Sequence, residues 1–186
     1  MKKGNTAAAW LLIPILLGHL GTMSYSMLTG WYRYGVCKAL AYASAALTAV
    51  HVGLSLLILF FKNDGADLGR YKKMKLRVIL QRASALGILA LLHLHVGAFD
   101  FIAAGSALSR LQKLGILLTE LLFFAAIFVH LGVSVGRSPI TFGLLREKEQ
   151  LRRADRITFV ICAVLMLLTT AALTGFVVTW TGHAGG

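Results

Sequence analysis

The chain has 186 residues, of which 58% are hydrophobic and 14% are charged, and it carries a net charge of +12. A soluble domain contains roughly 25% charged residues, so this composition excludes an ordinary soluble globular protein. It equally excludes a disordered chain, because disorder requires low hydrophobicity. The class that remains is an integral membrane protein built mostly from helices.

Five stretches are apolar enough to cross a hydrocarbon core of about 30 Å, which requires about 20 residues per helix. They cover residues 7–32, 40–61, 79–104, 114–136 and 157–181. The longest connections, 62–75 and 137–156, are too short to hold a second domain, so residues 1–186 are predicted to form one transmembrane bundle. The first stretch lacks an obvious small-residue cleavage site, which predicts a retained helix and not a cleaved signal peptide.

The basic residues predict which way these helices face. Fifteen of the 19 Lys and Arg residues fall at the N-terminus, in the second and fourth connections, or just inside the adjoining helix ends. The exceptions are Arg33, Lys38, Arg110 and Lys113. Because positive loops stay in the cytoplasm, the N-terminus is expected inside and the C-terminus outside. We therefore attribute the positive charge to topology and a partner-facing surface, and expect no nucleic-acid partner.

Histidines are the informative residues of the apolar stretches. Five of the six lie within predicted spans, namely His19, His51, His93, His95 and His130. Ionisable residues inside a membrane are costly and are usually functional. A single histidine hydrogen-bonded to a neighbouring helix would need no further explanation. Histidines on four successive spans favour a shared function, whereas His183 follows the last span and is expected in a solvated tail.

Depth in the membrane predicts how these histidines pair. Successive helices alternate in direction and rise about 1.5 Å per residue. This rise places His19 and His95 together in the outer half of the bilayer, and His51 and His130 together in the inner half. His93 lies on the opposite side of its helix from His95 and cannot serve the same pocket, so it is interpreted as a structural or quinone-proximal histidine.

Two histidines at one depth on facing helices can clamp a flat macrocycle between them. Bis-imidazole ligation leaves no open position on iron, which favours electron transfer over oxygen chemistry. Zinc is the competing metal, but it prefers a compact four-ligand cluster, usually with thiolates or carboxylates. A glycine also follows two positions after each of the four paired histidines, and we expect it to let a neighbouring helix pack closely.

The segment from His51 to His95 resembles the dihaem cytochrome b membrane-anchor subunit of succinate dehydrogenases and fumarate reductases. The resemblance is to the single-polypeptide, five-span type of menaquinone-using bacteria. Its features are a ligand His, the polar loop KNDGADLGRY, the pair Gln81-Arg82, and a second His fourteen residues after Gln81. Later in the chain, HLGVSVGRSPITFGLL carries Phe142-Gly143 after His130, as the family does. In the first span Ala8-Ala9-Trp10 stand where the family often has an Arg and a second His.

This resemblance implies a haem-binding four-helix core, one peripheral helix and two b haems. It implies that His51 and His130 ligate the proximal haem, His19 and His95 the distal haem, and that Arg82 binds a haem propionate. The anchor would hold a flavoprotein subunit and an iron–sulfur subunit on the cytoplasmic side of the cell inner membrane. It would pass electrons between a quinone, menaquinone by this resemblance, and the iron–sulfur clusters, without being catalytic itself. An Arg that reaches to the membrane interface is the alternative for Arg82.

Two acids are candidates for handling quinol protons. Glu120 lies ten residues before His130, about 15 Å nearer the outside, and Asp100 follows His95 by about one turn. Quinol oxidation releases two protons, and a nearby carboxylate can accept one. The alternatives are a protonated Glu120 bonded to a neighbouring helix and an interfacial Asp100.

Two other functions remain open from the sequence. The cytochrome b subunit of a hydrogenase or formate dehydrogenase also uses membrane histidine pairs, although the Gln-Arg spacing argues against it. A proton-coupled transporter would use its histidines as a relay, and such proteins often have helices broken by midspan Pro or Gly. Only Pro14 lies within a predicted span, so the transporter signal is weak.

Overall fold

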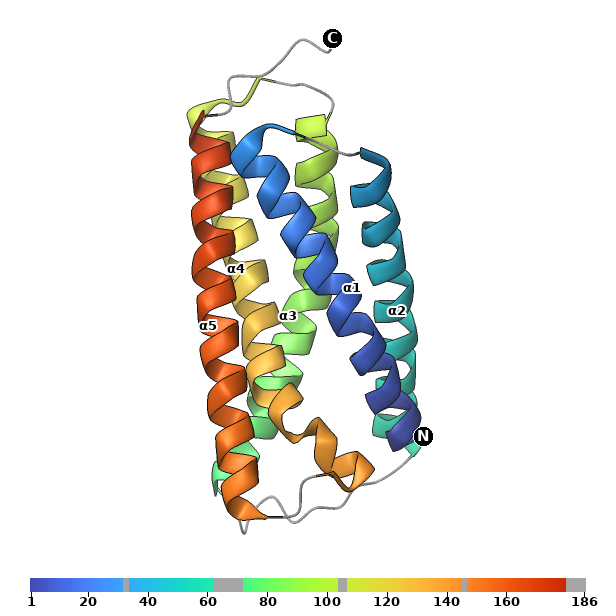
Figure 1. The fold of residues 1–186 in the computed structure, drawn as a ribbon. Coiled ribbons are helices and arrows are strands. Elements are labelled where there is room, and N and C mark those ends of the chain that lie inside the picture. The colour runs from blue at the N-terminus through green and yellow to red at the C-terminus, as the bar shows by residue number, and fades with distance from the viewer. Residues whose placement is uncertain (32–33, 62–71, 104–106, 145–146, 180–186) are drawn as a thin grey trace.

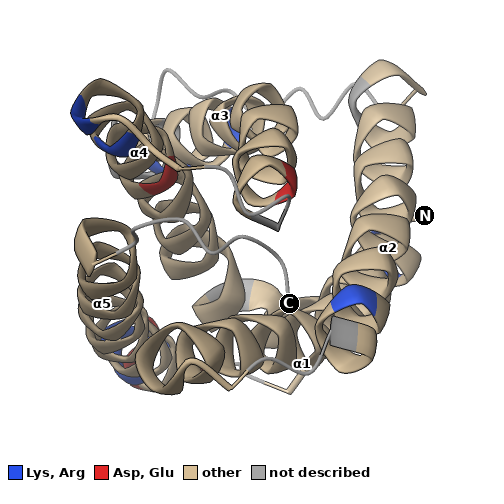
Figure 2. Cartoon of the chain, turned by 90° about the horizontal axis from the view of Figure 1, so that it is seen from above, with Lys and Arg blue, Asp and Glu red and all other residues tan. Residues whose placement is uncertain are grey.

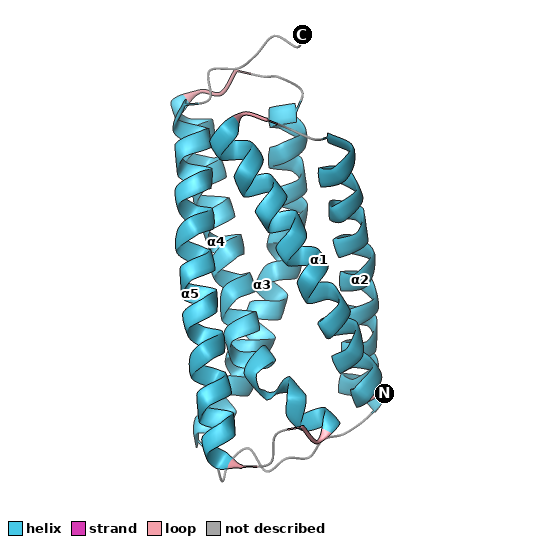
Figure 3. Ribbon diagram, in the orientation of Figure 1, coloured by secondary structure: helices cyan, strands magenta, loops and turns pink. Residues whose placement is uncertain are grey.

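The protein is a bundle of long helices. The computed structural model describes residues 1–31, 34–61, 72–103, 107–144 and 147–179, and these contain helices but no strand (Figure 3). In chain order the elements are α1 Lys2–Thr29, α2 Tyr34–Phe61, α3 Lys72–Ala103, α4 Arg110–Ser134, the 3₁₀ helix η1 Val135–Phe142, and α5 Lys148–Thr179. All five α-helices are long and apolar enough to cross a membrane. The predicted all-α, five-span class is therefore confirmed.

The helices extend beyond the apolar stretches that the sequence marks. α3 begins at Lys72 instead of residue 79, and α5 begins at Lys148 instead of residue 157. The added residues are rich in Lys, Arg, Glu and Gln, which are good helix formers and can reach from a helix end into the membrane interface. Some features predicted from the sequence lie outside the described residues. They are the span ends at residues 32, 104 and 181, the KNDGADLGRY loop and His183.

Local signals set two of the helix ends. α4 begins with a capping box, in which the Ser109 hydroxyl accepts the Gln112 backbone N–H and the Gln112 side chain accepts the Ser109 N–H. α1 ends at Gly30, whose φ of 70° is a left-handed conformation that glycine adopts without strain. The Gly30 N–H then donates to the carbonyl of Ser26 and closes the last turn.

The helices are arranged as two pairs joined by α5. α1 packs on α2, α3 packs on α4, and α5 packs on both α4 and α1 (Figures 1 and 2). Among the described residues, no Cα atom of the α1/α2 pair lies within 8 Å of the α3/α4 pair. The two pairs therefore face each other without backbone contact. We call the end that holds the start of α1 and the ends of α2 and α4 the basic end (Figure 1).

α5 was expected as a peripheral helix and is more closely packed than that. It carries no histidine, but Leu173 and Val177 are completely buried and Ala172 is 1% exposed. With Phe123, Phe124 and Phe128 of α4, α5 forms the apolar core of the bundle. By contrast, only 6% of the apolar segment of each of α1, α2 and α3 is buried within the chain. The α4/α5 contact is thus the main apolar packing that holds the fold.

A network of ionic and polar contacts closes the bundle near the basic end. The Arg77 guanidinium of α3 donates two hydrogen bonds of 2.9 Å to the Asp155 carboxylate of α5. Its Nε–H donates to the carbonyl of Val133 in α4 at 2.6 Å. At the same end, the indole N–H of Trp10 in α1 donates to the hydroxyl of Ser138 in η1 at 3.0 Å. Three helices are thus joined through one arginine, and α1 is tied to η1.

The glycines that follow the paired histidines do not mediate close helix contacts, so that expectation was wrong. A Cβ atom added at Gly21, Gly53, Gly97 or Gly132 would meet nothing within 4 Å. Close approach occurs instead at Gly136 in η1, where an added Cβ would lie 2.7 Å from Asp155 Oδ1 and 3.0 Å from Asp155 Cα. The glycines after the histidines thus border open space, which spacing along the chain does not reveal.

Replacement of Arg77 by Ala is expected to destabilise the bundle. The change leaves Asp155 without its bidentate partner and removes a bond to a main-chain carbonyl, at a cost of about 1–3 kcal/mol. Thermal unfolding of the purified protein in detergent measures the loss. The matched control is Arg152→Ala, whose partner Glu149 sits on the same exposed helix turn, and it should change stability by less than about 0.5 kcal/mol. Equal effects of the two variants would contradict this interpretation.

Replacement of Gly136 by Ala is expected to lower the unfolding temperature of the purified protein. The new methyl group would overlap the backbone of Asp155, so η1 and α5 would have to move apart. Gly115→Ala is the control, because its added Cβ meets no atom within 4 Å and alanine favours the helix. An unfolding temperature of the Gly136 variant at or above that of the Gly115 variant would show that the contact is not tight.

Candidate functional site

His51 and His130 face each other across the bundle. His51 lies on α2 and His130 on α4, and their ring centroids are 6.4 Å apart with an angle of 79° between the ring planes. No Cα atoms of the described parts of α2 and α4 come within 8 Å, so the two imidazoles span a gap between backbones. The structure brings together the two residues that their depth in the sequence had paired.

The separation of these two rings is that of two imidazoles bound to one metal ion. A metal–nitrogen bond to imidazole is about 2.0–2.1 Å long and the nitrogen lies about 1.2 Å from the ring centre. Two imidazoles on opposite sides of one ion therefore have centroids roughly 6.4–6.6 Å apart. The centroid distance between His51 and His130, 6.4 Å, lies at the lower end of that range. The spacing is therefore compatible with two imidazoles bound to one metal ion.

Hydrogen bonds at Nδ1 of His51 and His130 favour a metal-ligating role for these two residues. His51 Nδ1 lies 3.4 Å from the main-chain carbonyl of Asn5, whose side chain is bonded to Ser55. His130 Nδ1 lies 3.2 Å from both the carbonyl of Gln81 and the hydroxyl of Ser84. A carbonyl can only accept, so Nδ1 carries the proton in each ring and Nε2 keeps its lone pair. Fixing this tautomer is the usual role of the second hydrogen bond of a metal-ligating histidine.

His19 of α1 and His95 of α3 are the second predicted pair, and they lie further from the basic end. His19 Nδ1 is buried without a hydrogen-bond partner. His95 stacks on Phe123 at a centroid distance of 4.6 Å and meets the edge of Phe99 at 5.1 Å.

Glu120 is a direct partner of His95. Its Oε2 lies 2.7 Å from His95 Nδ1, and the side chain is 0% exposed. The second oxygen, Oε1, is buried without a hydrogen-bond partner. The sequence had marked Glu120 as a candidate proton acceptor, with a bond to a neighbouring helix as the alternative, and the structure shows such a contact with His95 of α3.

The other candidate side chains are exposed residues of α3. Arg82 is exposed and follows Gln81, the residue whose carbonyl contacts His130. Asp100 is exposed beyond His95, towards the end of the helix. His93 is also exposed, on the side of α3 opposite His95. This separation of His93 from His95 agrees with their helical spacing.

Sequence reasoning missed the small polar residues that hold the imidazoles. Asn5 and Ser84 each contact a paired histidine, Ser55 is hydrogen-bonded to Asn5, and Ser84 is buried. A buried serine three residues after Gln81 was a weak signal that could have been noticed. The Asn5 carbonyl carried no signal at all, because a main-chain group has no sequence signature.

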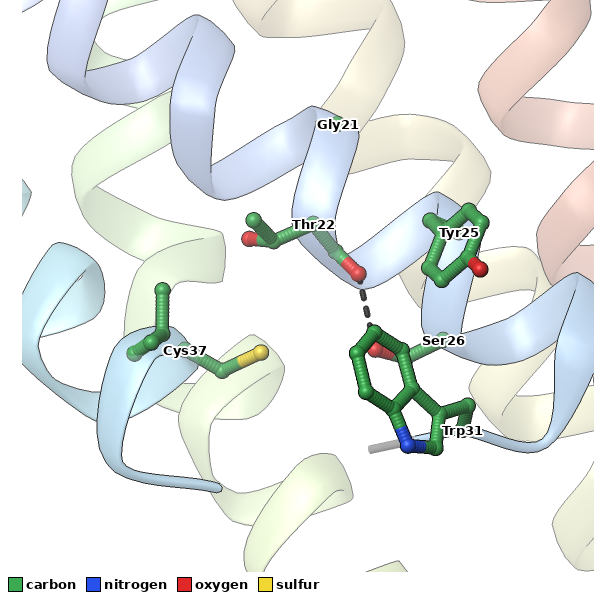
Figure 4. Close-up of a pocket in the computed structure, with 7 residues that line it drawn as sticks. Gly21, Thr22, Tyr25, Ser26, Trp31 and Cys37 are labelled. Atoms are coloured by element: carbon green, nitrogen blue, oxygen red, sulfur yellow. Dashed lines mark hydrogen bonds between the residues drawn. The ribbon is translucent and has the colours of Figure 1, made fainter. Parts of the chain in front are cut away.

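A small pocket lies between the end of α1 and the start of α2, beyond His19 from the basic end. Figure 4 shows Thr22, Tyr25, Ser26, Trp31 and Cys37 around it. Its volume is about 180 Å³, below the usual range of roughly 300–1,000 Å³ for ligand sites, so it has room for about one ring of a ligand. The Ser26 hydroxyl donates to the carbonyl of Thr22 at 2.8 Å.

The histidines occur in pairs and not in larger ligand groups. Among the residues that the structure describes, no three His, Cys, Asp or Glu side chains are placed to hold one metal ion. A haem iron can take two axial ligands from the protein, whereas a structural zinc site uses four protein ligands.

Comparisons with known proteins do not assign the chain to a family. No family model, no curated protein and no solved structure matches it. Function is therefore inferred from the chain's own residues. The most informative features are the close approach of the His51 and His130 rings and the hydrogen bonds that orient these imidazoles.

Proposed function

We propose that the protein is a dihaem cytochrome b membrane anchor. It would serve a succinate:quinone oxidoreductase or quinol:fumarate reductase and pass electrons between a quinone pool, menaquinone by resemblance, and an iron–sulfur subunit. One observation carries the proposal. The ring centroids of His51 and His130 are 6.4 Å apart, and these residues belong to two helix pairs that have no Cα atoms within 8 Å of each other. Nδ1 hydrogen bonds that leave Nε2 available support it.

The paired histidines would supply all four axial ligands. His51 and His130 would hold the haem nearer the basic end, and His19 and His95 the other. When bound, two b haems stacked across the bilayer supply an electron path between its faces. The chain's part is to orient His51, His95 and His130 through a contact at Nδ1 and to exclude water from the space between the helix pairs. α5 packs on both helix pairs, and the Arg77–Asp155 contact holds α3 on α5.

The basic end is the proposed docking side. By the positive-inside rule it faces the cytoplasm, with the N-terminus inside, the C-terminus outside and the chain in the cell inner membrane. Exposed Arg152 and Arg153 at the start of α5 lie at this end. A flavoprotein subunit and an iron–sulfur subunit would bind there, which places the haem held by His51 and His130 nearest to them.

Three further residues have proposed roles around these sites. Arg82 would bind a haem propionate, because its guanidinium can form a bidentate contact with a carboxylate and it makes no hydrogen bond or ion pair within the described residues. Asp100 would accept a quinol proton at the end away from the basic end. Glu120 was proposed from sequence for the same proton transfer. The pocket beside Tyr25 and Trp31 is a candidate for the quinone ring.

The haem proposal predicts two haems b per chain and the loss of one with each ligand pair. His51→Ala and His95→Ala should each lower the content to about one, because an iron with one axial imidazole is held weakly. Pyridine-haemochrome quantitation and a reduced-minus-oxidised spectrum of the purified protein measure this. The control is His93→Ala, two residues from His95 on the exposed side of α3, which should retain both haems.

No haem in protein expressed with haem supply and its partner subunits would overturn the proposal. Haem without co-purifying flavoprotein and iron–sulfur subunits of the succinate dehydrogenase type would favour the hydrogenase or formate dehydrogenase alternative. A haem-free protein that moves protons with a solute would favour the transporter.

Asp100→Asn is expected to slow quinol oxidation by about tenfold to a hundredfold while leaving both haems in place. The amide cannot accept the released proton, and water reaching this exposed position replaces part of the lost function. The rate of haem reduction by a menaquinol analogue measures the effect. Asp100→Glu keeps a carboxylate and should retain most of the rate. An unchanged rate in Asp100→Asn would remove Asp100 from the mechanism.

A further inference from the structure

Glu120 is an unusual residue for its position. Within the described part of the chain, it is the one acidic side chain that is completely buried, and it lies in the middle of a membrane helix. A carboxylate without solvent is strongly unfavourable unless hydrogen bonds and an opposite charge stabilise it. The surroundings of Glu120 should therefore contain both.

One hydrogen bond is evident. Glu120 Oε2 and His95 Nδ1 are 2.7 Å apart, which is a short contact of the charge-assisted kind. Phe123, one turn further along α4, stacks on the same imidazole, and Phe99 of α3 meets its edge. The ring of His95 is thus held on three sides, with Nδ1 directed at the acid and Nε2 left for another partner.

The opposite charge does not come from a basic side chain of the described residues. The ionic contact of Glu120 is with His95 alone, and its Oε1 has no hydrogen-bond partner. A metal centre bound to Nε2 of His95 would provide the missing positive charge through the ring. A doubly protonated His95 would also provide it, but such an imidazole has no lone pair left for a metal.

The two histidine pairs differ in this respect. His51 and His130 are directed at neutral main-chain carbonyls, whereas His95 is directed at a carboxylate. A carboxylate accepts the Nδ1 proton more strongly than a carbonyl does, which makes the imidazole a better electron donor. A more basic axial ligand stabilises ferric over ferrous iron and lowers the reduction potential.

We propose that Glu120 is a positioning residue that fixes His95 as a strongly donating ligand and lowers the reduction potential of the haem bound there. This inference rests on the proposed haem function. It gives Glu120 a different role from the quinol proton acceptor expected from the sequence. It also makes the two haem sites unequal through a completely buried residue of α4.

The test is a redox titration of the purified holoprotein carrying Glu120→Gln. The amide keeps a hydrogen-bond acceptor at nearly the same place but removes the charge. We expect one of the two midpoint potentials to rise, by about 59 mV for each tenfold loss of ferric preference, and the other to stay fixed. The transition that moves should be the one that disappears in His95→Ala. The electron paramagnetic resonance signal of that haem should change as well.

Glu149→Gln is the control for the loss of one carboxylate charge. Glu149 is exposed at the start of α5, where its partner is Arg152, so its replacement should leave both potentials unchanged. Glu120→Asp retains the charge but shortens the side chain, so it should shift the same potential in the same direction by less. If Glu120→Gln fails to fold or loses only the haem of His95, Glu120→Asp decides. A rise in the potential of the haem that His95→Ala loses supports the proposal, and no shift overturns it.

Two outcomes would overturn the inference while leaving the haem function intact. The first is an unchanged pair of potentials in Glu120→Gln, or a shift of the haem that His95→Ala retains. The second is a fall in quinol oxidation rate at unchanged potentials, which would return Glu120 to the proton-acceptor role. A wild-type protein without haem would instead overturn the proposed function itself.

Discussion

The fold depends on one constraint, that an imidazole inside a membrane needs a partner for its ring nitrogens. Water is absent there, so the partners must come from neighbouring helices. In this bundle they come from the carbonyl of Asn5, the carbonyl of Gln81 and the carboxylate of Glu120. Each engages Nδ1. The arrangement therefore orients the other nitrogen of three histidines on three helices in a common way.

That orientation matters because of how the helices are divided. α1/α2 and α3/α4 form separate pairs, and the histidines of one pair are directed across to the other. The pairs are joined at one side by α5, which packs on both α4 and α1, and near the basic end by the hydrogen bond from Trp10 of α1 to Ser138 of η1. The Arg77–Asp155 contact and the tight approach at Gly136 hold α3 and η1 on α5 at the same end.

The two ends of the bundle are chemically different. Near the basic end, the imidazoles contact neutral groups and the surface carries exposed arginines. Further along, His95 is held by a buried acid and two aromatic rings. A pair of haem sites built this way would differ in potential, and electrons moving between a quinone and a cytoplasmic subunit would pass between unequal stations. The asymmetry arises from Glu120, a residue ten positions away from the nearest paired histidine of its own helix.

The sequence by itself determined the number of apolar helices and the positions of the four paired histidines along them. These properties are local, because helix rise and hydrophobic length depend only on position along the chain. The partners of the imidazoles, the contact of Arg77 with Asp155 and the place of close approach at Gly136 were decided by the tertiary structure. The glycines after the histidines illustrate the difference, since a spacing that suggested helix packing faces open space. Such contacts depend on the rotation of each helix about its axis and on which helices become neighbours, and neither is encoded in a pattern that one helix shows alone.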